Sequence, residues 1–147
     1  MSPEISVVVP LYNEAANVAE LHRQLTEALR SHGCSYELIL VDDGSTDDTF
    51  RELTVLHAQD TQVCVVRLRR NFGQTAAFVA GFSRARGQVV ITSDGDLQND
   101  PRDIPALLVM LADGNDIVCG WRKDRKDPWL TRRLPSMLAN WLISVTT

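Results

Sequence analysis

Asp94 and Asp96 flank Gly95, directly after the apolar run of residues 89–91. The β-branched residues of this run predict a buried strand that helices cover on both faces. Gly95 permits a sharp turn, which projects both carboxylates just past the carboxyl end of the strand. Two hard oxygen ligands in one tight turn suit Mg²⁺ or Mn²⁺ carrying a diphosphate. A solvated acidic turn has the same pattern, so the metal-site hypothesis depends on what other elements bring to this turn.

Strands and helices alternate along the whole chain. Continuous β-branched runs predict the strands, and apolar residues at helical spacing predict the helices between them. This alternation is typical of right-handed βαβ units and a parallel sheet, and therefore of an α/β fold. We expect the first and fourth strands to lie side by side, where the strand order reverses. The predicted strands are residues 5–9, 36–41, 63–68, 89–91 and 116–119, and the predicted helices are about residues 15–31, 49–58, 74–86 and 104–112.

Polar loops follow four of these strands, at residues 10–14, 42–45, 93–96 and 120–122. Ligands of open parallel sheets bind outside the carboxyl ends of the strands, so the convergence of these loops strengthens the metal-site hypothesis. Asp42 and Asp43 could instead cap the next helix. No chemistry is assigned to residues 71–74, which are interpreted as a turn and a helix start. The chain has neither GxGxxG after its first strand nor GxxxxGK[ST], which disfavours dinucleotide-binding and P-loop enzymes.

Charge is unevenly distributed along the chain. Residues 1–119 carry 9 Lys/Arg and 17 Asp/Glu, whereas residues 120–147 carry 6 and 2. The acidic body argues against nucleic-acid binding, and the basic end favours an anionic partner such as a phosphate or a lipid head group, or is a solvated helix face. The three cysteines form no CxxC pair, which favours a reducing compartment over disulfides or a zinc site. Neither a signal peptide nor a membrane-spanning run is expected.

Five short motifs are recognisable. They are Val-Val-Val-Pro-Leu-Tyr-Asn-Glu (7–14), Val-Asp-Asp-Gly-Ser-Thr-Asp-Asp-Thr (41–49), Ser-Asp-Gly-Asp-Leu-Gln-Asn-Asp-Pro (93–101), Gly-Trp-Arg (120–122) and Arg-Arg-Leu-Pro-Ser-Met-Leu-Ala-Asn-Trp-Leu (132–142). Together they resemble family 2 glycosyltransferases of the GT-A fold, especially the dolichyl-phosphate mannosyltransferase branch and its bacterial polyprenyl-phosphate relatives. The resemblance implies a Rossmann-like three-layer α/β sandwich with a mostly parallel sheet. Catalytic domains of this family usually continue further, so we expect a chain truncated at its C-terminus that contains the nucleotide-binding half.

The resemblance also implies a role for individual positions. The residues expected to bind the nucleoside-diphosphate sugar are Pro10, Tyr12 and Glu14 on the nucleoside, Val41 and Asp43 on the base, and Ser93, Asp94, Gly95 and Asp96 on the diphosphate. Asp94 and Asp96 are also the expected catalytic residues, because they would hold the metal with Gln98. Arg122 and Arg132 are expected to face the phosphate of the acceptor.

The implied reaction is inverting transfer of a sugar to a polyprenyl phosphate, such as undecaprenyl or dolichyl phosphate. A phosphate acceptor needs no general base, because it is largely ionised at neutral pH. No base stands out in the sequence, since His22, His32 and His57 all fall in predicted helices away from the loops. The alternatives are transfer to a glycan hydroxyl, with a base beyond residue 147, and a non-catalytic nucleotide-binding fragment. A phosphoacceptor signalling domain would leave residues 10–14 unexplained.

The last residues have a pattern of their own. We expect a nucleotide-sugar-binding domain at residues 1–128 and an amphipathic helix at residues 129–147, where apolar residues follow helical spacing beside arginines. The predicted helix lies on the cytoplasmic face of a membrane, which makes the protein peripheral. The alternatives are packing against the sheet and self-association into a homo-oligomer.

Overall fold

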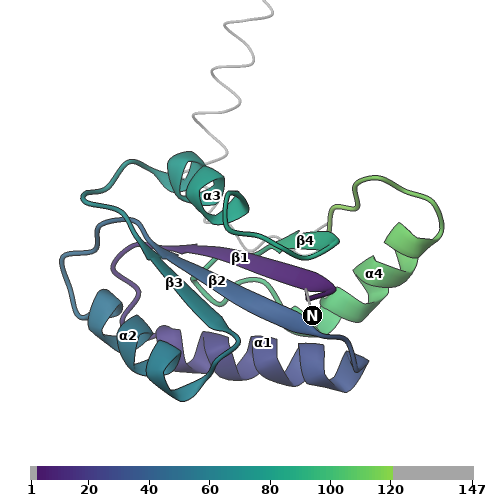
Figure 1. Ribbon diagram of the computed structural model, residues 1–147, viewed down its shortest axis with the longest axis horizontal. Coiled ribbons are helices and arrows are strands. Elements are labelled where there is room, and N and C mark those ends of the chain that lie inside the picture. Colours follow the sequence, from purple (N-terminus) through teal and green to yellow (C-terminus); the bar gives the residue numbers. More distant parts are fainter. Residues whose placement is uncertain (1–2, 121–147) are drawn as a thin grey trace, which may run out of the picture. The chain divides into compact units, whose positions relative to one another are not determined.

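The computed structural model describes residues 3–120, which form a parallel four-stranded sheet with the strand order β3-β2-β1-β4 (Figure 1). The strands are β1 (Ile5–Leu11), β2 (Tyr36–Asp42), β3 (Val63–Arg67) and β4 (Val89–Thr92). The helices are α1 (Val18–His32), α2 (Thr49–Gln59), α3 (Gln74–Phe82), the short 3₁₀ helix η1 (Pro101–Asp103) and α4 (Ile104–Ala112). Ile5 pairs with Tyr36 on one side and with Val89 on the other, so β1 lies next to β4 as predicted.

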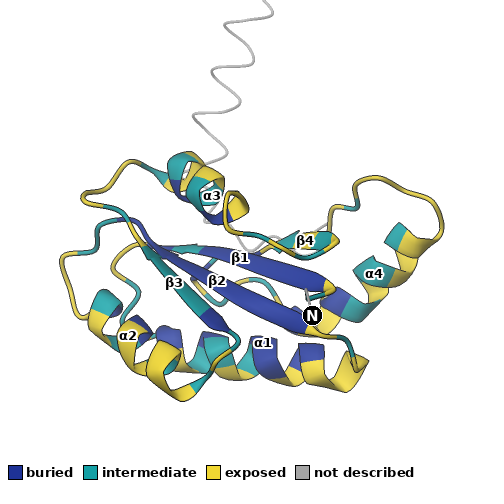
Figure 2. Ribbon diagram, viewed as in Figure 1, coloured by how far each residue is buried: buried dark blue, intermediate teal, exposed yellow. Residues whose placement is uncertain are grey.

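The sheet has a core on each face because side chains alternate along its strands. The odd-numbered apolar residues of β1 pack with Leu38 and Leu40 of β2 against α1, α2 and α4. Val8, Ile39 and Val41 face the opposite way and pack against α3. Figure 2 shows β1 and β2 as the most deeply buried strands, between these two helical layers. The three-layer α/β fold is therefore confirmed.

Helix α3 packs close to the sheet because its inner face carries small residues. Ala77 is fully buried, and a Cβ atom at Gly81 would collide with Cγ1 of Val8. The helix ends at Phe82, four residues before the predicted end. The backbone N–H of Arg86 instead donates to the side chains of Glu37 and Ser6, so it is withdrawn from the helical hydrogen-bond pattern.

Two expectations for β4 and the region beyond it are wrong. Residues 116–119 form no strand, so the described sheet ends at β4. The prediction that helices cover both faces of the fourth strand also fails, because Val90 is 44% exposed. Residues of β4 alternate between half-buried and exposed, since α3 packs on β1 and β2 and leaves one face of β4 uncovered within residues 3–120.

The chain divides into two compact units, residues 1–116 and residues 117–147. Only residues 117–120 of the second unit belong to the described part, so the helix expected at residues 129–147 and the boundary expected at residue 128 lie outside it. Among residues 3–120, no helix is both long and apolar enough to cross a membrane.

Candidate functional site

A cavity of about 420 Å³ opens at the carboxyl ends of β1, β2 and β4. Three of the four polar loops meet there as predicted, and the fourth, at residues 120–122, lies mostly outside the described residues. It is lined by Pro10, Leu11, Tyr12, Glu14, Asp43, Asn71, Gly73, Gln74, Asp94, Gly95 and Asp96. The cavity thus brings together most of the residues that the sequence nominated for the nucleoside and the diphosphate.

The turn after β4 orients both of its carboxylates by hydrogen bonds. Asp94 accepts a hydrogen bond of 2.7 Å from Nε2 of Gln74 and one of 3.4 Å from Nδ2 of Asn99. Asp96 accepts one of 3.0 Å from the backbone N–H of Gln98. Amide donors therefore hold the two carboxylates in place, and each carboxylate keeps lone pairs for a further partner.

Gly95 serves this turn in a different way from the one predicted. A Cβ atom there would lie 3.0 Å from Cδ2 of Leu11 and 3.1 Å from the carbonyl oxygen of Pro10. Leu97, with a φ of 60°, is the residue of this turn with left-handed backbone. Gly95 is thus needed for close approach to the end of β1.

Both carboxylate oxygens of Asp43 bind the loop that follows β3. They accept hydrogen bonds of 2.9 Å each from the backbone N–H groups of Phe72 and Gly73. The residue is only 3% exposed, although it lines the cavity. Asp43 therefore fixes the position of the loop at residues 71–74 beside the cavity.

Asp42 and Asp43 do not cap α2, so that alternative is wrong. Asp42 is fully buried, accepts a hydrogen bond of 3.0 Å from the backbone N–H of Ser45 and lies 3.4 Å from Nε of Arg67. Asp47 is the residue that accepts from the backbone N–H of Thr49, at 2.9 Å. The two aspartates at the end of β2 are thus committed to the loops around the cavity.

The loop after β1 is joined to the segment that precedes α2. The backbone N–H of Glu14 donates to Oγ1 of Thr49 at 2.8 Å, and the N–H of Asn13 donates to Oγ of Ser45 at 3.0 Å. Asn13 has a φ of 55°, which Asn tolerates better than most residues. These bonds hold Tyr12, which is 44% exposed, at the rim of the cavity.

Several nominated residues lie outside this cavity. The side chain of Val41 is buried in the core beneath α3, so it does not line the cavity. Ser93 is also buried, and its hydroxyl donates to the carbonyl oxygen of Asp94 at 3.3 Å. Gln98 lines a neighbouring cavity, while Arg122 and Arg132 lie outside the described residues.

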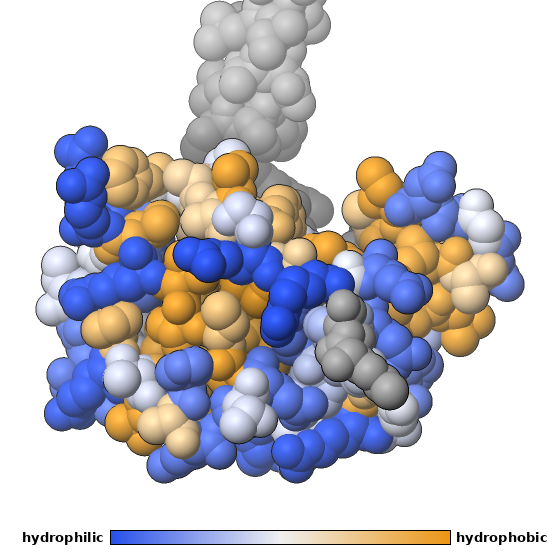
Figure 3. Space-filling view, viewed as in Figure 1, coloured by the Kyte–Doolittle hydropathy of each residue, from blue (hydrophilic) through white to orange (hydrophobic). Residues whose placement is uncertain are grey.

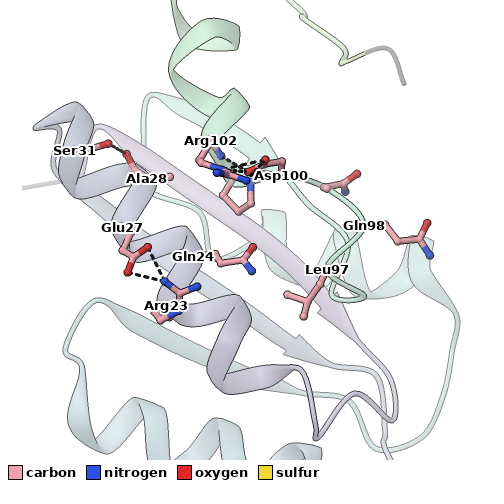
Figure 4. A pocket seen from close by; sticks show the side chains of 11 residues that line it. Arg23, Gln24, Glu27, Ala28, Ser31, Leu97, Gln98, Asp100 and Arg102 are labelled. Atoms are coloured by element: carbon pink, nitrogen blue, oxygen red, sulfur yellow. Dashed lines mark hydrogen bonds and ion pairs between the residues drawn. The ribbon is translucent and has the colours of Figure 1, made fainter. Parts of the chain in front are cut away.

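The neighbouring cavity, of about 630 Å³, lies between α1 and residues 97–102 (Figure 4). Although it is the larger of the two, its cations are paired with acids in its own wall. Arg23 contacts Glu27 at 2.7 Å, and Arg102 contacts Asp100 at 2.8 Å. The Arg102 guanidinium holds the pKa of the Asp100 carboxyl below its usual range. With its charges already neutralised, this cavity is a weaker candidate site.

The donor set fits a metal ion that arrives together with a diphosphate. Within residues 3–120, no group of three or more His, Cys, Asp or Glu side chains could hold a metal ion. Asp94 and Asp96 supply two carboxylates, and Mg²⁺ is usually held by one or two carboxylates together with waters and substrate phosphates. A tightly bound structural metal would need more protein ligands than the described residues provide.

Sequence reasoning missed Gln74, which the structure places at the cavity in contact with Asp94. A signal was available, because residues 71–74 follow β3 at the same sheet edge as the other loops. The prediction that no histidine acts as a base is consistent with the geometry. His22 contacts Asp60 at 2.9 Å, and Nδ1 of His57 contacts the carbonyl oxygen of Val63 at 2.6 Å, both away from the cavity.

Comparison with known proteins decides the family. The family model described as "Glycosyl transferase family 2" matches residues 6–145. The chain belongs to this family. It is 46% identical, over 148 aligned residues, to the dodecaprenyl-phosphate galacturonate synthase of Rhizobium johnstonii. The alignment covers 99% of this chain and 44% of the relative. The chain therefore spans less than half the length of this curated relative.

Solved structures agree with the fold. A mannosyltransferase from Pyrobaculum calidifontis, in complex with GDP-Man and Mn²⁺, superposes with a TM-score of 0.62 at 26% identity, over 74% of this chain and 32% of its own. S. aureus TarS 1–349, in complex with UDP-GlcNAc, gives a TM-score of 0.61 at 20% identity, over 89% of this chain and 42% of its own. The expected GT-A fold is confirmed.

Proposed function

We propose that this chain is the nucleotide-sugar-binding part of an inverting glycosyltransferase that transfers a sugar to a polyprenyl phosphate. The observation that carries the proposal is the cavity in which Asp43, Asp94 and Asp96 meet at the carboxyl edge of the sheet. The name of the 46% identical relative supports galacturonate as the sugar and a dodecaprenyl-type phosphate as the acceptor.

The chemistry follows from the charges around the cavity. Displacement at the anomeric carbon leaves negative charge on the departing diphosphate. Mg²⁺ or Mn²⁺ would stabilise that charge as a Lewis acid and orient the diphosphate. Asp94 and Asp96 would hold the ion, while Gln74 and Asn99 keep Asp94 oriented. The Mn²⁺ bound to the Pyrobaculum calidifontis enzyme makes Mn²⁺ the first choice for experiments.

The acceptor needs no deprotonation by this part of the protein. A phosphate monoester has a second pKa of about 6, so it is already largely ionised at neutral pH. This property agrees with the described residues, because the histidines that form side-chain hydrogen bonds there are directed away from the cavity. Arg122 and Arg132 remain the proposed contacts to the acceptor phosphate.

We infer a membrane surface as the place of work, because the proposed acceptor is a lipid. Charge supports this inference: residues 61–93 contain five arginines and no acidic residue, although the rest of the described chain is acidic. Arg67 pairs with Asp42 and Arg86 with Glu37. The other three arginines, at positions 69, 70 and 84, are exposed and form no salt bridge within residues 3–120.

Apolar side chains accompany these arginines. Phe72 is 51% exposed, and Val79 and Phe82 of α3 are 62% and 45% exposed. Figure 3 shows apolar side chains gathered over α3. Exposed aromatic residues beside unpaired arginines are typical of surfaces that bind anionic membranes. The proposed location is the cytoplasmic face of the membrane.

Sugar transfer tests the proposed function. The purified chain is incubated with Mn²⁺ and a panel of radiolabelled nucleotide sugars that includes nucleoside-diphosphate galacturonate, together with polyprenyl phosphate or the free polyprenol. Label should pass to the phosphate and not to the alcohol. Equal transfer to the alcohol would refute the phosphate acceptor. Binding of the sugar nucleotide without transfer to either lipid would favour a nucleotide-binding fragment instead.

A further inference from the structure

The loop at residues 70–74 is fixed to the rest of the site at three places. Its backbone donates two hydrogen bonds to the carboxylate of Asp43. Its first residues pack closely against Gly44, and a Cβ atom added at Gly44 would collide with the backbone of Arg70. Its last residue, Gln74, donates to Asp94. The loop thus spans the cavity from the end of β2 to the turn after β4.

The geometry of this loop determines where Gln74 lies. Gly73 has a φ of 93°, a left-handed value that L residues rarely adopt, and it immediately precedes α3. The N–H of Gly73 is one of the two groups held by Asp43. The start of α3, and with it the side chain of Gln74, therefore depends on the carboxylate of Asp43.

We propose that Asp43 and Gln74 form a positioning relay that orients Asp94 for its ligand. Asp43 holds the loop, the loop places Gln74, and Gln74 holds one oxygen of Asp94 at 2.7 Å. The relay connects the nucleoside side of the cavity with its diphosphate side. It rests on the proposed function, because Asp94 is the carboxylate proposed to hold the metal.

The relay makes Asp43 important for an ion that it does not contact. Its two oxygens are both bound to backbone N–H groups, and Asp43→Asn replaces one acceptor by an N–H₂ donor that faces another donor. The loop must then shift, and Gln74 moves with it. Gln74→Ala removes the same support for Asp94 directly, at the other end of the relay.

Direct measurement of Mn²⁺ binding in the presence of nucleoside diphosphate tests this relay. The electron paramagnetic resonance signal of the free ion reports how much Mn²⁺ remains unbound. Gln74→Ala and Asp43→Asn should each weaken Mn²⁺ binding by about threefold to tenfold, the effect of losing one ordinary hydrogen bond that orients a ligand. The double variant should be little worse than either single variant, because both act on the same support.

Two control variants match these changes. Thr75→Ala alters the next residue of α3, and Asp48→Asn removes one negative charge from an exposed position that pairs with Arg51. Both should bind Mn²⁺ as the wild type does. Additive effects of Asp43→Asn and Gln74→Ala, or a loss as large in the controls, would overturn the relay.

A second readout separates the relay from the proposed function. In nuclear magnetic resonance spectra of the wild-type chain without ligand, the backbone N–H groups of Phe72 and Gly73 should be protected from exchange. Asp43→Asn should remove this protection and shift the side-chain amide signal of Gln74. Asp94→Asn should shift the Gln74 signal but leave the two backbone N–H groups protected. Unchanged spectra refute the relay even if Mn²⁺ binds. Absence of Mn²⁺ and nucleotide binding in the wild type refutes the proposed function, whatever the spectra show.

Discussion

At the scale of single residues, Gly44 is the position that most directly sets the shape of the site. Its φ of 69° is left-handed, and a Cβ atom there would overlap the backbone of Arg70. Since backbone cannot move aside as a side-chain end can, the loop at residues 70–74 would have to shift. The consequence would reach Asp43 and Gln74, which hold the same loop.

Gly44→Ala should therefore lower the free energy of unfolding by more than about 1 kcal/mol, because it adds a steric clash to the strain of left-handed backbone. Urea unfolding at neutral pH measures the change. Gly33→Ala is the matched control, since Gly33 also has a left-handed φ, of 77°, but no atom lies within 4 Å of its added Cβ. Equal losses in the two variants would show that the contact with Arg70 is unimportant.

Sequence identified carboxylates more readily than the residues that hold them. Asp94 and Asp96 could be nominated because their turn follows a strand at the sheet edge where other polar loops were expected to converge. Gln74 was missed because its partner is 20 positions away in the sequence, although its place after β3 at the same sheet edge was a signal. Val41 was nominated for a base contact, but alternation along β2 turns its side chain into the core.

At the scale of elements, β4 depends on a cluster around the buried Glu37 at the amino ends of the strands. Glu37 of β2 accepts hydrogen bonds from Ser6 of β1 at 2.7 Å and from Nη2 of Arg86 at 2.6 Å. The N–H of Gly87 donates to the same serine at 2.8 Å. The cluster fixes the turn that leads from α3 into β4, and therefore the register of the strand that carries Asp94.

Glu37→Gln should destabilise the fold by about 2 kcal/mol at pH 7, the range for hydrogen bonds to a buried charged group. Burial alone would raise the pKa of Glu37, but the hydrogen bonds from Arg86 and Ser6 outweigh it, so the pKa lies below the ordinary value of 4.5. A lowered folded-state pKa stabilises the protein above the unfolded-state value, and this contribution is lost as the pH falls through the folded-state pKa.

Urea unfolding of the wild type and Glu37→Gln at pH 7 and pH 3 checks this sign. The difference between the two proteins should shrink at the lower pH, where Glu37 begins to take up a proton. The exposed Glu27→Gln serves as the control for loss of a carboxylate elsewhere. A difference that is constant, or that grows at pH 3, contradicts the assigned role of Glu37.

The order of elements could be predicted further than their ends. Hydrophobic periodicity located the four strands and four α-helices of residues 3–112, and their alternation predicted that β1 lies beside β4. The end of α3 could not be read from periodicity, because Arg86 is withdrawn by a tertiary contact with Glu37. The strand expected at residues 116–119 has an apolar pattern, but within the described chain β4 acquires no further neighbour.

At the scale of the whole molecule, charge is segregated between segments. The described acidic residues lie before residue 61 or after residue 93, while residues 61–93 contribute only arginines. The overall acidity seen in the composition conceals this separation. The exposed apolar side chains of α3 and the exposed arginines that flank it, at positions 69, 70 and 84, form a surface of their own in addition to the basic end of the chain.

The chain should float with anionic phospholipid vesicles at low salt and be released as salt rises, because each arginine near such a surface contributes about 1 kcal/mol. Arg69→Glu with Arg70→Glu should weaken flotation and lower the salt concentration at which the chain is released. Arg23→Glu with Arg30→Glu makes the same charge change on α1 and should have little effect. If both pairs reduce flotation equally, the attraction has no preferred face, and if the wild type does not float, the surface proposal fails. The amphipathic helix expected at residues 129–147 stays a prediction.

The central claim is that Asp94 and Asp96 bind a nucleoside-diphosphate sugar together with a divalent metal. Isothermal titration of the chain with nucleoside-diphosphate galacturonate, in Mn²⁺ and in EDTA, tests it most directly. Binding should require Mn²⁺ and be lost in Asp96→Ala, whereas the exposed Asp113→Ala variant should bind normally. Ligand at 100 times its dissociation constant should then stabilise the wild-type fold by about 2.7 kcal/mol. Equal affinity in Mn²⁺ and in EDTA, or full binding by a folded Asp96→Ala variant, would contradict the account.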